Sequence, residues 1–538
     1  MGISTADKGQ EKAGLHAVAA IYLFMVACMV PLYMRNGYYG LSTGKFMLYR
    51  NTGFFVLPVL FSVCAGKGIC RIKQMGRRQE EAVRKWITSL LPEIFLFGYG
   101  LCNLLSFFLS PYKKDGLFGA EGWYMGLFSQ LSFLLLYFYY AYVWKAEKEA
   151  VAVILAVGGF ICAFAVLNRF GIWPAALPGR TEGTLSTIGN VNWLCGYLSV
   201  MLPAGTVLFW GSRRNTDRGQ AGKAAAAGLF TAAAFLCTAI QGSDSGLLVS
   251  GTVLCILFRI SCRDAEGMDA FWDVLVTAAG AWLAGGLLRD CFPQRILYES
   301  KSLALLSVKT AAPVFLAAAG GRAFWKYRRS KGDPELCRRQ LVRMKKGFAV
   351  FWILLLAGAA LLLTAGVWGP AALKERLPAL FIPDAKWGNG RGGIWGECLD
   401  IWSREPLLRR LFGVGPDCLN AFLYTEQGSR PLLAVTYRDA VLTNCHNEWM
   451  TILMNTGAAG LLAYVGFLVT VFQRLFRKRS LPALVGAAVL LTYTVHNMVS
   501  FQQITSTPLL FLALGLSHSL SRLFGGDLYL DSGSGKIK

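Results

Sequence analysis

Charge is scarce in this sequence, and acidic charge is the scarcest. Only 16% of the 538 residues are charged, 54% are apolar, and the mean hydropathy is +0.45. Soluble globular proteins carry about 25% charged residues, so a chain this apolar cannot keep its surface in water, and soluble classes are excluded. Apolar runs replace the missing charge, and about 20 apolar residues suffice to span a bilayer. The composition predicts an all-α polytopic membrane protein.

Signatures of metal and redox sites are also missing. The 14 Cys are scattered without a CxxC pair, only four His occur, and no metal-ligand cluster is visible, so we expect no metal and no cofactor. No repeat or inverted half-repeat is visible, which argues against several transporter folds. Four Cys lie in segments expected outside the membrane and could pair in ways that the sequence leaves open: Cys291, Cys398, Cys418 and Cys445.

Hydropathy and flanking charge predict about 14 transmembrane helices (12 to 14). The first run is too long for a signal-peptide core and is predicted to be a retained anchor. The spans are placed near residues 15–34, 52–69, 86–110, 124–144, 150–168, 188–210, 224–241, 245–260, 271–288, 304–321, 347–368, 447–472, 481–500 and 505–521.

The basic residues indicate how these spans are oriented. Connections on the side of the N-terminus hold 34 of the 54 Lys and Arg, and the other side holds 20. Because Lys and Arg accumulate in cytoplasmic loops, both termini are predicted to be cytoplasmic, with the chain in the plasma membrane. The most basic connections, Lys67–Lys85 and Arg322–Lys346, suit contact with anionic lipid headgroups. The membrane topology and contact with anionic lipid therefore explain the net charge of +23, and no nucleic acid is expected as a partner.

One long connection divides the chain. We expect an N-terminal transmembrane bundle (1–170), a central transmembrane region (171–368), an extracytoplasmic loop (369–446), and C-terminal helices with a cytoplasmic tail (447–538). Long connections of this kind are usually functional. Within the loop, residues 394–404 are predicted to form a short amphipathic helix at the membrane interface. Its expected apolar face consists of Ile394, Trp395, Leu399 and Trp402.

Arg391 lies just before this helix and is a candidate catalytic residue. A guanidinium always carries its charge and can bind diphosphate oxygens through two N–H groups at once. The alternative is an Arg that is solvated or paired with Asp384 or Glu397. Membrane lipid phosphates or a lipid-linked diphosphate are therefore candidate ligands of Arg391.

His446, at the outer mouth of the next span, is the candidate base. A neutral His near pH 7 can take a proton from an attacking hydroxyl, and Asn447 or Glu448 could orient it or bind substrate. The alternative is a His that only caps the helix. His496 is the runner-up, and the two remaining candidates, His16 and His518, lie near the cytoplasmic side.

Two further polar elements stand out. Arg180, Asn190 and Asn192 lie at the outer mouth of the sixth predicted span, where amide groups and N–H donors suit anions or sugar hydroxyls. The alternative is ordinary helix capping. Glu93 is the only acid placed within a span, which suggests a function or a partner for an Arg or a Ser.

The motifs, in this order, resemble the O-antigen ligase and polymerase family. The family has a Gly-Arg before an aromatic helix, a Phe-Gly-x-Gly-Pro turn, a His-Asn before a span, and a Thr-Gly-x-x-Gly segment. Upstream, Thr187–Asn192 matches its Gly-Asn-x-Asn element, whereas Gln241–Gly246 replaces its usual Ser-Arg pair. The matching segments are Gly390-Arg391-Gly392-Gly393-Ile394-Trp395, Phe412-Gly413-Val414-Gly415-Pro416, His446-Asn447 and Asn455-Thr456-Gly457-Ala458-Ala459-Gly460.

The resemblance implies a glycosyltransferase that inverts the anomeric centre without a metal. Its donor would be a glycan linked to a polyprenyl pyrophosphate, namely undecaprenyl pyrophosphate, on the outer leaflet. Its acceptor would be a hydroxyl group of a glycan, a lipid or a protein. His446 would be the base, Arg391 would neutralise the diphosphate, and Arg180 would take the place of the missing Arg. The motifs do not separate a ligase from a polymerase. A lipid-sugar flippase and a non-catalytic scaffold are the rival interpretations.

Overall fold

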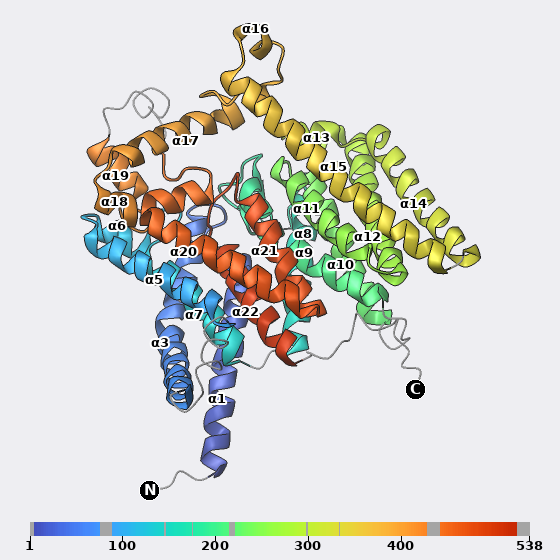
Figure 1. Ribbon diagram of the computed structural model, residues 1–538. Helices are drawn as coiled ribbons and strands as arrows, with labels where there is room; N and C mark the ends of the chain where they lie inside the picture. Colours follow the sequence, from blue (N-terminus) through green and yellow to red (C-terminus); the bar gives the residue numbers. More distant parts are fainter. Residues whose placement is uncertain are drawn as a thin grey trace.

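α-Helices form nearly all of the regular structure in the described part of the chain, as the computed structural model shows (Figure 1). The described residues are 5–75, 89–144, 147–174, 176–214, 221–296, 298, 300–332, 334–427 and 442–523. The first half contains α1 (Thr5–Phe24), a π-helical turn (Met25–Met29), α2 (Val30–Leu32), α3 (Leu41–Met75), α5 (Leu91–Leu109), α6 (Lys113–Phe118), α7 (Leu127–Tyr142), α8 (Lys148–Arg169), the antiparallel strands β1 (Thr184–Leu185) and β2 (Gly189–Asn190), α9 (Val191–Arg214), α10 (Ala221–Ile240) and α11 (Ser245–Ser261).

The second half is also helical. It contains α12 (Ala265–Cys291), a 3₁₀ turn (Pro293–Arg295), α13 (Lys301–Leu305), α14 (Val308–Lys331), α15 (Pro334–Trp368), α16 (Ala371–Lys374), a second 3₁₀ turn (Ala379–Phe381), α17 (Trp387–Arg404), α18 (Leu407–Phe412), α19 (Leu419–Glu426), α20 (Glu448–Lys478), α21 (Leu481–His496) and α22 (Thr507–Leu523). The predicted all-α class is confirmed, and each predicted span overlaps one of these helices.

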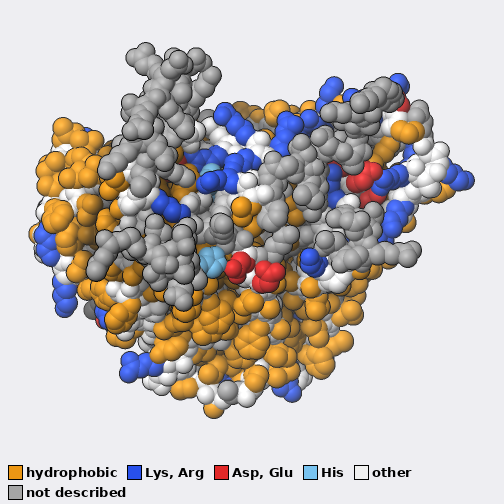
Figure 2. Space-filling model, turned by 90° about the horizontal axis from the view of Figure 1, so that it is seen from below, with side chains coloured by type: hydrophobic (Ala, Val, Ile, Leu, Met, Phe, Trp, Pro, Cys, Tyr) orange, Lys and Arg blue, Asp and Glu red, His pale blue; other side chains and the backbone are white. Residues whose placement is uncertain are grey.

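Nine helices of the described part are long and apolar enough to cross a membrane. α11 and α21 are shorter apolar helices. Large apolar side chains such as Phe55, Phe97 and Leu229 are exposed on the outside of the bundle, as expected for side chains that face lipid. Viewed from below, apolar side chains cover much of the surface in Figure 2, with Lys and Arg between them and few acidic side chains. These features indicate a membrane-embedded protein, whereas the number and direction of the spans stay predictions.

The core of the bundle forms around α22. α20 packs along α5, α21 along α9, and α22 against α7 and α21 (Figure 1). The apolar residues from Leu509 to Leu512 are all buried, so α22 has little surface left for lipid. α15 lies at the edge of the bundle, and its apolar stretch is not buried at all.

The basic connection expected at Arg322–Lys346 is largely helical. α14 continues to Lys331 and α15 begins at Pro334. Several of its basic residues therefore lie on helical turns that extend beyond the apolar spans. Arg322 and Arg329 pair with Asp273 and Asp269 of α12, so part of this charge stabilises helix packing.

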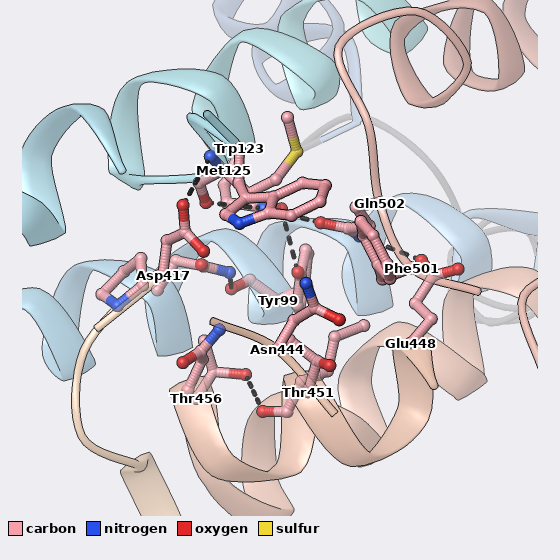
Figure 3. A pocket seen from close by; sticks show the side chains of 15 residues that line it. Tyr99, Trp123, Met125, Asp417, Asn444, Glu448, Thr451, Thr456, Phe501 and Gln502 are labelled. Carbon is pink, nitrogen blue, oxygen red and sulfur yellow. Dashed lines mark hydrogen bonds between the residues drawn. The ribbon is translucent and has the colours of Figure 1, made fainter. Parts of the chain in front are cut away.

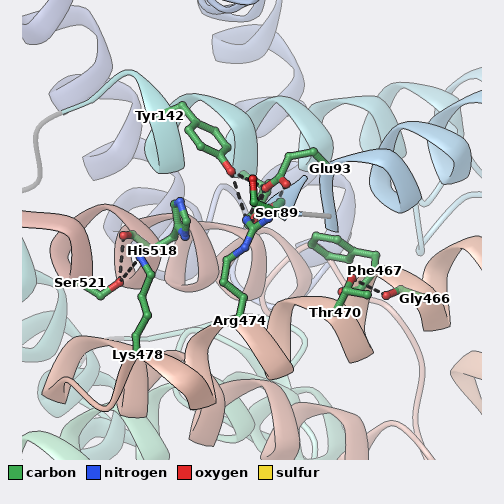
Figure 4. Close-up of polar contacts among 11 residues, drawn as sticks. Ser89, Glu93, Tyr142, Gly466, Phe467, Thr470, Arg474, Lys478, His518 and Ser521 are labelled. Carbon is green, nitrogen blue, oxygen red and sulfur yellow. Dashed lines mark hydrogen bonds and ion pairs between the residues drawn. The ribbon is translucent and has the colours of Figure 1, made fainter. Parts of the chain in front are cut away.

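Glu93 has an Arg partner, which is one of the two alternatives left open by the sequence. Both of its carboxylate oxygens accept from Arg474 of α20, at 2.5 and 2.6 Å, and Tyr142 donates to one of them at 2.6 Å (Figure 4). The side chains of Glu93 and Arg474 are 9% and 12% exposed. The pair therefore joins α5 to α20 inside the bundle.

Replacing Arg474 by Met should destabilise the protein by about 3–5 kcal/mol, because the buried Glu93 carboxylate loses its partner. Unfolding in detergent, followed by circular dichroism, measures this change. Arg477→Met is the matched control, since Arg477 is exposed on the same helix. The double variant Glu93→Leu with Arg474→Met should recover much of the loss. Equal stability of the Arg474 and Arg477 variants would contradict a structural role for the pair.

Candidate functional site

Two of the glycine motifs pack directly against each other. Gly413 and Gly457 both have positive φ, 75° and 69°, a conformation that favours glycine. A Cβ on Gly413 would lie 2.3 Å from the Asn455 backbone, and one on Gly457 would lie 2.2 Å from the backbone of Leu411. Val414 and Gly415 donate backbone hydrogen bonds to the carbonyls of Met454 and Asn455, at 3.1 and 3.0 Å. The Phe-Gly-x-Gly-Pro turn is thus fixed to a kink in α20.

α17 carries Arg391 and begins with a left-handed turn. Gly388, Asn389 and Gly390 have φ of 58°, 67° and 87°, and regular helical geometry starts at Arg391. Arg391 therefore lies in the first turn of the regular helix, where the helix dipole favours an anion. The N–H of Gly393 in this turn already donates to the carbonyl of Ala385, at 3.1 Å.

The prediction that the apolar face of this helix contacts the membrane is wrong. Ile394, Cys398 and Ile401 are buried against protein, in a cluster with α19 and the segment before α20, whereas Leu399 is 46% exposed. Trp395 donates its indole N–H to the carbonyl of Cys445 at 2.9 Å. The apolar face thus holds α17 against the loop that carries His446, because the loop folds into a small core of its own.

The Arg391 guanidinium is half-buried and has no carboxylate partner within the described part of the chain. It donates to the carbonyls of Gly388 at 2.8 Å and Val499 at 3.2 Å. Its Nε is buried without a hydrogen-bond partner, and burial lowers the pKa of the guanidinium. Neither Asp384 nor Glu397, the partners considered from the sequence, neutralises it. Arg391 is therefore a cation with hydrogen-bonding capacity left over for an anion.

His446 lies close enough to Arg391 for the positive charge of Arg391 to affect its pKa. Burial and then the positive charge of Arg391 lower the pKa of His446 below its ordinary value of 6.5, so the imidazole is neutral at pH 7. Its backbone has φ of 48°, and its N–H donates to Asn444 Oδ1 at 2.9 Å. The ring lies edge-on to Phe501, with centroids 5.6 Å apart. Among the described residues, none hydrogen-bonds its ring nitrogens.

Residues 497–499, between α21 and α22, bring the two candidates together. Val499 accepts from Arg391, Met498 accepts from the Asn447 amide at 2.9 Å, and Asn497 accepts from the Glu448 backbone at 3.0 Å. This segment was missed from the sequence. Its only signal is a polar run, Asn497 to Ser506, between two apolar helices.

Asn447 and Glu448 have structural contacts that the sequence did not predict. The Asn447 amide caps α20 through Met450 N at 2.9 Å. Glu448 is buried, and its carboxylate accepts from Tyr464 at 2.6 Å, Asn497 at 2.5 Å and Gln502 at 3.0 Å. Because these bonds occupy both side chains, neither orients the His446 ring in this structure.

Near His446 lies a cavity that Asn444 and Phe501 help to line, together with further amide, hydroxyl and apolar side chains (Figure 3). Aromatic side chains of Trp123 and Phe501 form part of its wall. Asn103 is 1% exposed, and its Oδ1 has no hydrogen-bond partner. The cavity is lined by Tyr99, Asn103, Trp123, Met125, Gln130, Pro416, Asp417, Asn444, Glu448, Thr451, Ile452, Asn455, Thr456, Phe501 and Gln502. Amides, hydroxyls and aromatic faces together suit a sugar ring.

Asp417 is the second acid of the cavity and was also missed. One of its oxygens accepts from the backbone N–H groups of Ala120 and Met125, both at 2.9 Å. Burial raises the pKa of Asp417 to about 7. The residue follows the Phe-Gly-x-Gly-Pro turn directly, so its place beside that motif was the available signal.

An aromatic row joins His446 to the start of α9. Its rings are those of His446, Phe501, Trp123 and Trp193, with the last two centroid distances 4.6 and 5.6 Å. Trp193 is next to Asn192 in the Gly-Asn-x-Asn element. The element is therefore near the cavity, although its own polar groups are used locally.

Asn190 and Asn192 are exposed and make capping and bridging bonds. Asn190 Oδ1 accepts from Asn192 N at 2.8 Å, and Asn192 Oδ1 accepts from Ser243 Oγ at 2.6 Å. Arg180 is exposed over the ring of Trp173, 5.5 Å from its centroid. No described contact brings Arg180 to Arg391 or His446.

The Gln241–Gly246 turn, where the resemblance led us to expect a Ser-Arg pair, is supported by Arg169. Arg169 is 4% exposed and donates to the carbonyls of Ile240, Gln241 and Glu182. Three of its N–H groups thus hold backbone carbonyls in and around this turn, so Arg169 supports the turn.

The other histidines do not form a comparable site. His496 is buried, and both its ring nitrogens lack hydrogen-bond partners. His16 contacts Glu147 at 2.8 Å, and His518 packs against Tyr142. Among the described residues, no group of three or more His, Cys, Asp or Glu side chains could hold a metal ion.

Neither the protein-family models nor the curated proteins include a match to this chain. The resemblance to the O-antigen ligase and polymerase family therefore rests on the sequence motifs.

Cys398 of α17 and Cys445, the neighbour of His446, have Sγ atoms 3.5 Å apart. Oxidised glutathione should join them by thiol–disulfide exchange, because a small shift gives the usual S–S bond of about 2.05 Å. Mass spectrometry of unreduced peptides detects the bond. Cys418 is the internal control, since its thiol donates to the carbonyl of Pro416. A bridge to Cys418 in place of Cys398–Cys445 would contradict the arrangement of α17 described here.

Proposed function

We propose that this protein is a membrane glycosyltransferase of the O-antigen ligase type. It transfers a glycan from a polyprenyl-pyrophosphate carrier to an acceptor hydroxyl at the outer surface of the plasma membrane. One observation carries the proposal. Arg391, which has no carboxylate partner among the described residues, lies near a neutral His446, and a cavity lined by amides and hydroxyls is close to both. A polymerase of the same family would use the same groups and differ only in its acceptor.

The two groups match the two tasks of the reaction. The acceptor oxygen bonds to the anomeric carbon while the bond from that carbon to the pyrophosphate oxygen breaks. His446 takes the acceptor's proton, and the electron pair leaves with the pyrophosphate. Arg391 and the first turn of α17 stabilise the negative charge that develops there. Attack from the face opposite the leaving group inverts the anomeric centre.

The cavity beside His446 supplies a place for the sugar of the acceptor or donor. Its amides and hydroxyls offer hydrogen bonds to sugar hydroxyls, and Trp123 and Phe501 offer aromatic faces. A flippase would instead be expected to place unpaired ionisable groups along a path through the membrane. The buried ions Glu93 and Arg474 are paired with each other, and the buried Lys45 is held by the carbonyls of Val30, Pro31 and Tyr33. Charges held in such structural contacts favour the transferase.

Transfer by the purified protein tests the proposal. The protein is reconstituted with an undecaprenyl-pyrophosphate oligosaccharide and candidate acceptors, and the product is detected by mass spectrometry. A new glycosidic bond with release of undecaprenyl pyrophosphate supports a transferase. Movement of the intact donor between leaflets without bond formation would establish the flippase, and failure of both reactions with a binding partner captured would favour the scaffold.

A further inference from the structure

A second cavity lies at the end of α20 opposite to His446. The residues that line it come from the ends of α9, α11 and α20 and from the start of α21, and they are Trp210, Ile260, Arg263, Leu475, Phe476, Arg479, Ser480, Leu481, Leu484 and Ala487. Because α20 has 31 residues, its two ends are about 45 Å apart. This cavity is therefore separate from the site of glycan transfer.

Two arginines line this second cavity, and no Asp or Glu is among its lining residues. Arg263 and Arg479 line it, and neither forms an ion pair with a described carboxylate. The nearby Arg214 pairs with Asp264, so the acid next to Arg263 already has a partner. Burial, followed by repulsion from Arg479 and Arg259, lowers the pKa of Arg263, and the attraction of Asp264 offsets only part of this effect. An anion between Arg263 and Arg479 would relieve this repulsion.

The backbone conformation of Arg479 also supports a site for an anion. Arg479 ends α20 in the left-handed conformation, with φ of 48°. Gly or Asn adopts this conformation more easily than Arg. An Arg at this corner, lining a cavity with a second Arg, is better explained by a use for its charge than by the turn. The hydroxyl of Ser480, the next residue, is buried without a hydrogen-bond partner and is free to donate to a ligand.

The remaining walls are apolar. Ile260, Leu475, Leu481 and Leu484 line the cavity together with the ring of Phe476, which lies 5.8 Å from the Arg263 guanidinium carbon. A free inorganic anion has no use for apolar walls, whereas a phospholipid offers a phosphate and an acyl chain side by side. Basic pockets between helices on the cytoplasmic side are typical sites for anionic lipid headgroups, and the distribution of Lys and Arg predicts this end of α20 to be cytoplasmic.

We propose that this cavity binds one anionic phospholipid. Arg263 and Arg479 hold its phosphate, Ser480 donates to a phosphate oxygen, and an acyl chain lies along Leu481 and Leu484. The site does not depend on the proposed transfer reaction.

Native mass spectrometry of the full-length protein in detergent, titrated with phosphatidylglycerol, tests the site. The double variant Arg263→Gln with Arg479→Asn removes both charges, and Asn suits the left-handed corner. It should weaken the tightest phosphatidylglycerol binding about tenfold or more, as expected for losing charge-assisted hydrogen bonds. Arg477→Gln is the matched control, because Arg477 is exposed nearby but does not line the cavity, and it should bind as the wild type does.

Two further ligands distinguish the sources of phosphate. Phosphatidylcholine should bind more weakly than phosphatidylglycerol, since its headgroup carries no net charge. Glycerol 3-phosphate should not displace phosphatidylglycerol, because it lacks acyl chains. Displacement by glycerol 3-phosphate would assign the site to a soluble anion, and unchanged lipid binding by a folded double variant would exclude these arginines; either result overturns the proposal.

Discussion

Replacing His446 by Ala or Asn should reduce the rate of glycan transfer by about 10²–10⁴-fold, the usual contribution of a general base. The acceptor hydroxyl would then lose its proton only to water. Asn is the safer variant for folding, because it tolerates the left-handed backbone that His446 adopts, with φ of 48°. Single-turnover transfer with saturating donor measures the change, and thermal unfolding in detergent checks that each variant is folded.

The pH dependence provides a second readout for His446. Burial and the charge of Arg391 lower its pKa, so the neutral, active form persists below the ordinary value of 6.5. Transfer by the wild type should therefore fall only when the pH drops below about 6.5. His16→Ala is the control, since His16 lies far along the chain beside Glu147. Full transfer by folded His446 variants would remove the proposed base from the mechanism.

The fold class could be predicted from the sequence because it depends on local composition. Apolar runs of span length form helices wherever they occur in a membrane, and every predicted span overlaps a helix. The glycine motifs were informative for a related reason. Gly413 and Gly457 lie where two backbones are in contact and no Cβ would fit. The presence of Gly at these positions therefore indicates the close contact.

The contacts that assemble the site could not be predicted in this way. Val499 holds Arg391 across 108 residues of sequence, and only the packing of α21 and α22 brings that carbonyl near. The apolar face predicted for the membrane interface included Leu399, which is exposed, whereas Ile394, Cys398 and Ile401 are buried in the core of the loop. Helical periodicity indicates that a face is apolar, while the partner that covers it is decided by the tertiary fold.

Arg391 should be nearly as important as His446. Arg391→Gln is expected to lower the transfer rate by about 10²–10³-fold, the cost of removing one preorganised charge stabiliser. Arg391→Lys should retain part of the activity, because Lys keeps the charge but loses the two-pronged geometry. Arg404→Gln is the matched control on the same helix, since Arg404 is 72% exposed and pairs with Asp400.

A purely structural Arg391 would be distinguished by the pH profile. In Arg391→Gln the positive charge that lowers the pKa of His446 is gone, so the fall in the remaining activity should move to higher pH. Guanidinium ion added to Arg391→Ala should restore part of the transfer if the cation itself acts on the diphosphate. Loss of activity with an unshifted pH profile and no rescue would mean that Arg391 only supports α17, through its bonds to Gly388 and Val499, and the diphosphate would need another partner.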